Sequence, residues 1–107
     1  MTTGKFAGAI AVIFVSQRTR DDEAGYARAA ETMAARAAAM PGYRGIHSAR
    51  GPDGHGVTIS YWADEASARA WRDDPEHARI RELGRARWYE SYELIVAEVT
   101  RAHDWHR

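Results

Sequence analysis

The sequence predicts an α+β fold of the ferredoxin-like type, a β-α-β-β-α-β sheet with both helices on one face. Three observations support this prediction. The first and last predicted strands, residues 6–15 and 89–101, are apolar at consecutive positions. A segment with helical periodicity is followed by a glycine-rich hairpin turn. A second helical segment, interrupted by a proline, then leads into the final strand.

The first strand is expected to be covered on both sides, since a strand with one solvent-exposed face would be polar at every second position. Here the two faces carry Ile10, Val12 and Phe14 on one side and Ala9, Ala11, Ile13 and Val15 on the other. Acidic residues 21–23 then favour a helix start, because they lie at the positive end of the helix dipole. Apolar residues at helical spacing continue to Met40, and Pro41-Gly42 ends the helix.

The remaining elements follow from turn and cap residues. Residues 43–50 and 57–62 are expected to be strands of a hairpin whose turn is residues 51–54. Asp64 or Ser67 can begin a short helix through Trp71, and Asp74 and Pro75 begin another. The final strand is expected at 89–101. Residues 1–101 therefore form one predicted domain, and residues 102–107 are expected to be a tail.

The predicted sheet has one face without helices, yet its first and last strands have apolar residues for both faces. A second copy of the chain, packed sheet against sheet, would cover that face. We therefore expect a homodimer of the dimeric α+β barrel type.

Composition excludes several classes of partner. Lysine and arginine total 15, aspartate and glutamate total 15, and the formal net charge is zero. We therefore expect no nucleic-acid partner and no membrane association. The chain has no cysteine, and its first residues lack a signal-peptide pattern, so a cytoplasmic location is expected.

Several motifs in the second half of the chain point to a family. The strand at 58–62, Trp71, Pro75-Glu76-His77, Leu83-Gly84 and the segment WYESY at 88–92 together resemble the antibiotic biosynthesis monooxygenase family. The resemblance covers most of the chain and implies the same dimeric α+β barrel. It also implies a range of activities, from cofactor-independent oxygenation of aromatic phenols to haem degradation.

His77 and Arg81 are the candidate catalytic residues. They lie one helical turn apart, and His77 could act as a base while Arg81 holds an anion. The substrate-binding candidates are three indoles that could form the walls of an aromatic slot and two phenols that could donate to a developing anion: Trp62, Trp71, Trp88, Tyr61 and Tyr92. Each candidate also has a structural alternative, in which the histidine caps a helix and the aromatic rings pack the core.

Three functions remain open at this stage. The first is a cofactor-independent monooxygenase acting on a small aromatic substrate with dioxygen, with no cofactor expected. The second is haem binding or degradation. Trp71 follows Trp62 at a spacing similar to that of the haem-degrading branch, but Arg81 occupies the position of that branch's iron-ligating histidine. The third is a non-catalytic ligand-binding or stress-related dimer. No metal site is predicted, since His103 and His106 lack a third ligand.

Overall fold

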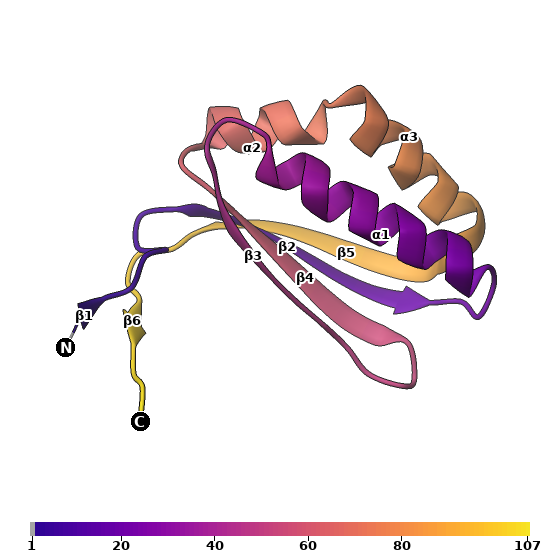
Figure 1. Ribbon diagram of the computed structural model, residues 1–107, viewed down its shortest axis with the longest axis horizontal. Helices are drawn as coiled ribbons and strands as arrows, with labels where there is room; N and C mark the ends of the chain where they lie inside the picture. The colour runs from indigo at the N-terminus through magenta and orange to yellow at the C-terminus, as the bar shows by residue number, and fades with distance from the viewer. Residues whose placement is uncertain (1) are drawn as a thin grey trace.

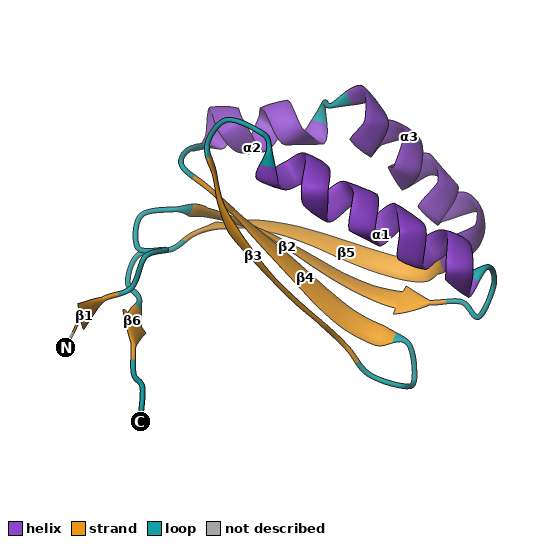
Figure 2. Ribbon diagram, viewed as in Figure 1, coloured by secondary structure: helices purple, strands orange, loops and turns teal. Residues whose placement is uncertain are grey.

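Four antiparallel strands form the main sheet of the computed structural model, which describes residues 2–107. The sheet order is β3-β4-β2-β5, with β2 at Ile10–Arg18, β3 at Tyr43–Arg50, β4 at His55–Trp62 and β5 at Tyr89–Glu98. The helices α1 (Glu23–Ala38), α2 (Glu65–Arg72) and α3 (Pro75–Leu83) all lie on one face of this sheet (Figure 1). The two layers are plain in Figure 2. The predicted ferredoxin-like α+β fold is confirmed.

Strand register decides which side chains lie beneath the helices. Val12 pairs with Ser60 and Val96, and Val12 packs against the core below the helices. Side chains alternate along a strand, so Ile13 and its partners Ile59 and Ile95 lie on the opposite face. None of the helices within residues 2–107 covers that face (Figure 2), and Ile95 remains 41% exposed.

Trp62 is the centre of the core and has no exposed surface. It packs with Ala37 of α1 and with Ala68 and Trp71 of α2, and its indole Nε1 donates to the Ser60 hydroxyl at 3.0 Å. The Tyr43 ring meets it edge-on with centroids 5.7 Å apart. One large indole on β4 therefore joins both helices to the sheet.

Each helix begins at an aspartate whose side chain accepts a backbone N–H. Asp22, Asp64 and Asp74 cap α1, α2 and α3 in this way. Gly42 ends the turn after α1 at a φ of 83°, and a Cβ there would lie 2.1 Å from the Ser67 hydroxyl. Among residues 2–107, no helix combines the length and apolar character needed to cross a membrane.

The structure differs from the sequence prediction at several boundaries. β2 begins at Ile10 and not at residue 6, because residues 6–9 form a turn with Gly8 at a φ of 83°. β5 ends at Glu98, short of residue 101. A π-helical turn, η1 (Gly84–Trp88), lies between α3 and β5 and was not predicted.

The predicted tail also contains a short strand. Within residues 102–107, β6 (His103–Asp104) pairs with β1 (Thr2–Thr3) and joins the two ends of the chain. Figure 1 shows this pair extending away from the main sheet, and Trp105 beyond it is 72% exposed.

Replacing the central indole should destabilise the fold far more than replacing the exposed one. We expect Trp62→Ala to lower the free energy of unfolding by about 3–5 kcal/mol, through lost burial and a cavity. Trp105→Ala makes the same chemical change at an exposed position and should alter it by less than about 0.5 kcal/mol. Urea unfolding followed by far-ultraviolet circular dichroism measures both. Equal losses in the two variants would contradict this account of the core.

Candidate functional site

Trp62, Trp71 and His77 form one continuous stack from the sheet to α3. The rings of Trp62 and Trp71 lie 6.1 Å apart at an interplanar angle of 26°, and those of Trp71 and His77 lie 4.2 Å apart at 17°. Both indoles are buried. The structure thus brings three predicted site residues together, but it packs the indoles against each other, with a ring stacked on either side of Trp71.

His77 lies at the joint between α2 and α3. The hydrogen-bond partner of its ring shows which ring nitrogen carries the hydrogen. Nδ1 lies 2.9 Å from the Trp71 carbonyl oxygen. A carbonyl only accepts, so Nδ1 carries the hydrogen and the lone pair is on Nε2. Burial lowers the pKa of His77, although the carbonyl contact opposes the shift. The imidazole is therefore neutral at pH 7, with Nε2 as its basic atom.

Asp74 holds this joint to α1. Its carboxylate accepts from Nε and Nη2 of Arg36 at 2.7 and 2.9 Å, and also from the His77 backbone N–H at 3.0 Å. The Arg36 guanidinium, with the backbone hydrogen bonds, lowers the pKa of Asp74 to about 2 despite burial. The sequence indicated Asp74 as a helix cap. Its partner Arg36 is 38 residues away, and no local pattern indicated the pair.

Arg81 lies on the outside of the same joint. Its Nη1 donates to the Arg72 carbonyl at 3.3 Å, near the end of α2. Its positive charge contributes to lowering the pKa of His77. The contact leaves other donors of the guanidinium free for an anion.

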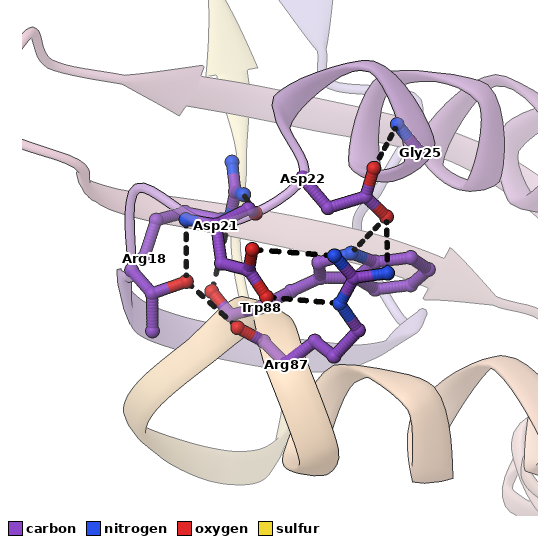
Figure 3. A network of polar contacts seen from close by, with 7 residues as sticks. Arg18, Asp21, Asp22, Gly25, Arg87 and Trp88 are labelled. Atoms are coloured by element: carbon purple, nitrogen blue, oxygen red, sulfur yellow. Dashed lines mark hydrogen bonds and ion pairs between the residues drawn. The ribbon is translucent and has the colours of Figure 1, made fainter.

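Trp88 belongs to a different part of the molecule. Its Nε1 donates to Asp22 at 3.2 Å, beside the paired Arg87 and Asp21, as Figure 3 shows. These contacts fasten η1 to the loop between β2 and α1. Trp88 is buried against Tyr26, with ring centroids 6.0 Å apart. The structure gives it no ring contact with Trp71 or His77 among the described residues.

Tyr92 lies on the helix-facing side of β5, beside an apolar strip. Its ring contacts Phe14 of β2 at 5.1 Å, and its hydroxyl accepts from Arg85 Nε at 2.7 Å. Further along the same side of β5, Leu94 and Val96 are each 53% exposed. We call Phe14, Tyr92, Leu94 and Val96 the β5 strip. It is apolar surface that remains open on the covered side of the sheet.

Tyr61 lies on the opposite face of the sheet from Trp62. It stacks on Phe6 with centroids 3.8 Å apart, and its hydroxyl is 3.0 Å from Nδ1 of His47. Neighbouring residues of a strand point to opposite faces. The expectation that Tyr61 and Trp62 line one pocket therefore has to be corrected.

The sequence analysis also missed two features of this region. Arg85 was not singled out, although it lies only seven residues before Tyr92 and donates to its hydroxyl. The openness of Leu94 and Val96 was not anticipated either, since alternation assigns a face but not how closely a helix covers it.

Ionisation of Asp74 should make the stability of the fold depend on pH. Its pKa is about 2 in the folded state and near 3.8 when unfolded, so its contribution is complete above pH 4 and is lost as pH falls toward 2. Asp74→Asn should lower the melting temperature at pH 7 and make little difference near pH 2. Asp73→Asn, at the exposed neighbour paired with Arg72, is the matched control and should have a smaller effect at pH 7. A pH-independent deficit in Asp74→Asn would contradict the assignment.

Comparisons with known proteins agree with this architecture. The family model for antibiotic biosynthesis monooxygenase matches residues 9–83. The uncharacterized protein YqjZ of Bacillus subtilis is 45% identical over 91 residues, which cover 85% of this chain and 79% of YqjZ.

Two solved structures show the same fold at low identity. A conserved protein from Methanosarcina mazei Go1 has a TM-score of 0.76 at 13% identity, over 87% of this chain and 94% of that one. A variant of SnoaB, a cofactor-independent oxygenase from Streptomyces nogalater, has a TM-score of 0.73 at 19% identity, over 85% of this chain and 92% of that one. With a family model matched over most of its length and a close relative in YqjZ, this chain belongs to the antibiotic biosynthesis monooxygenase family.

Proposed function

We propose that this protein is a cofactor-independent monooxygenase of small phenolic substrates, working in the cytoplasm as a homodimer. Family membership supports oxygenase chemistry, and the similar fold of SnoaB, named as a cofactor-independent oxygenase, supports a reaction without a cofactor. The observation that carries the proposal is the β5 strip, since a flat aromatic molecule needs apolar surface that the protein has not covered itself.

In the proposed reaction the substrate loses a phenolic proton and the resulting electron-rich anion reacts directly with dioxygen. His77 is the proposed base, because its imidazole is neutral and its Nε2 holds the lone pair. Arg81 is the proposed charge partner for the anion. The buried indoles Trp62 and Trp71 support the imidazole by packing beneath it.

Tyr92 is the proposed hydrogen-bond donor on the strip. Its hydroxyl oxygen accepts from Arg85, so its own hydrogen is available to the substrate. The nearby guanidinium strengthens that donation, since it stabilises the partial negative charge on the phenol oxygen. Trp88, buried at the η1 turn, supports this proposal only by holding the start of β5.

Removing the base should reduce turnover without unfolding the chain. With a panel of anthrones and naphthols, we expect His77→Ala to lower kcat/KM by about 100-fold, as oxygen consumption would measure. His77→Asn, which keeps a donor for the Trp71 carbonyl, should show the same loss. In the natural chain kcat/KM should rise with pH as His77 loses its proton, with a midpoint below 6.5. His55→Ala, on the exposed hairpin, is the control and should match the natural chain.

The same preparations distinguish the other two hypotheses. Hemin titration that shifts the Soret band in the natural chain but not in His77→Ala would favour a haem protein. Saturable binding of the phenols with no oxygen consumption would favour a non-catalytic ligand-binding dimer. Unchanged turnover in both His77 variants would remove the assignment of the base.

The homodimer is proposed from the uncovered sheet face. Ile13, Ile59 and Ile95 form a row across three strands on that face. A row of isoleucines left in water forgoes the free energy gained by burial, about 25 cal/mol for each Å². A second copy supplies a matching apolar row, since a two-fold interface pairs a surface with itself.

A charge in the middle of this row should separate the subunits. We expect Ile13→Lys to raise the dimer dissociation constant by at least 100-fold, because two lysines would meet across the two-fold interface. Ala27→Lys adds the same charge on the exposed side of α1 and should leave association unchanged. Sedimentation equilibrium measures both. A monomeric natural chain, or a dimer unaffected by Ile13→Lys, would contradict this interface.

A further inference from the structure

A polar cavity of about 490 Å³ lies at the end of the molecule away from the His77 joint. It lies where β2 ends, α1 begins and the β3–β4 hairpin turns, at the right-hand end of the sheet in Figure 1. Its lining comes from residues 17–20, Glu23, residues 50–54 and Glu90. This volume is typical of sites for small molecules. Neither the proposed base nor the β5 strip contributes to it.

Arg18 forms part of the wall and is only 9% exposed. Its guanidinium lies 3.8 Å from the centre of the Tyr26 ring. Nε donates to the Trp88 carbonyl and Nη2 to the Asp21 carbonyl, each at 3.0 Å (Figure 3). All of these hydrogen-bond partners are neutral, and the Asp21 carboxylate, which acts on Arg18 only through its charge, is itself paired with Arg87.

Arg50 approaches the same tyrosine from the hairpin. It donates to the Ser16 hydroxyl at 2.8 Å, to the Tyr26 hydroxyl at 3.3 Å and to the carbonyls of Ser16 and Gly54. These partners are neutral as well. Burial raises the pKa of the adjacent Tyr89, so that phenol adds no negative charge.

From Thr2 to Arg107, neither Arg18 nor Arg50 has a carboxylate within ion-pair distance. Seven ion pairs within 4.0 Å occur among residues 2–107, and they use Arg36, Arg69, Arg72, Arg79, Arg85 and Arg87. Arg18 and Arg50 are in none of them. Other arginines, such as Arg20, Arg28 and Arg44, are also in none, but those are exposed, whereas Arg18 is buried and Arg50 is half-buried. Burying a charge without an opposite charge is costly. An anion bound from solvent would supply an opposite charge within hydrogen-bond distance of these guanidinium groups.

Arg18 also has a donor that is free of partners among residues 2–107. No hydrogen bond from its Nη1 is found within the described part of the chain, where no buried side-chain nitrogen lacks a partner. Nη1 is therefore reached by solvent, and Arg18 is one of the residues that line the cavity. The exposed carboxylates of Glu23, Asp53 and Glu90 also line the cavity, and they would repel a ligand with several negative charges.

We propose that this cavity binds the single anionic group, carboxylate or phosphate, of a small ligand, with Arg18 Nη1 and Arg50 Nε as donors. Two guanidinium groups converging on one anion are a common arrangement for recognising such groups. The acidic rim excludes polyanions, so the ligand is a small molecule and not a nucleic acid. This inference does not depend on the oxygenase proposal.

The test is a titration of the isotope-labelled natural chain followed by heteronuclear NMR. Sodium benzoate and inorganic phosphate are the two probes, and sodium chloride at equal ionic strength is the control. We expect saturable shifts of the Arg18 and Arg50 Nε–H signals and of the Gly54 amide. The Kd should be about 1 mM or lower. The stronger probe identifies the anion class, and trisodium citrate should bind more weakly than benzoate.

Matched variants connect binding to the two arginines. Arg50→Gln should weaken binding about tenfold, whereas Arg69→Gln, an exposed arginine paired with Glu65, should leave it unchanged. Glu90→Gln at the rim should tighten binding about twofold and keeps the test decisive if Arg50→Gln fails to fold. Shifts reproduced by sodium chloride, no saturation by either probe, or unchanged affinity in both cavity variants would overturn the proposal.

Discussion

The Asp74 carboxylate joins α3 to α1, and the arrangement of the candidate site follows from it. It accepts from the backbone of His77 and thereby starts α3, and it holds Arg36 of α1 through two hydrogen bonds. The joint between α2 and α3 is thus attached to α1. Because His77 is the third residue of α3, the same carboxylate fixes where that imidazole stacks on Trp71.

The aromatic rings stacked beneath His77 connect this joint to the sheet. Trp71 packs on Trp62, and Trp62 has no exposed surface, so the imidazole sits on a rigid aromatic base. A proposed general base benefits from such support, since a fixed ring keeps its lone pair in one direction. The indoles therefore contribute to the site by packing, which differs from the open aromatic slot that the sequence suggested.

Three surfaces of the domain lie apart from one another and differ in polarity. The isoleucine row occupies the face without helices, the β5 strip lies on the helix side where cover is incomplete, and the polar cavity lies at the end of the sheet. The proposed association surface, the proposed substrate surface and the proposed anion site therefore share no residues. The pairing of β1 with β6 joins the two ends of the chain, at the end of the sheet that lies away from the cavity (Figure 1).

The sequence by itself determined the α+β class and the order of the main strands and helices, but not η1 or the β1–β6 pair. These properties depend on local signals, such as the aspartates that cap helices, the glycines of the turns and the alternation along strands, and β3 begins and ends where the pattern predicted. The sequence also placed His77 at the third position of a helix that begins after Asp74.

Only the tertiary structure decided which candidates meet. Tyr61 and Trp62 are adjacent in sequence yet lie on opposite faces of the sheet, and Trp88 joins Asp22 across 66 residues and not the stack at Trp71. Likewise, Arg36 pairs with Asp74, and Arg18 and Arg50 both lie against the Tyr26 ring. Contacts between distant segments depend on how helices and strands pack in space, and short-range periodicity contains no information about that packing.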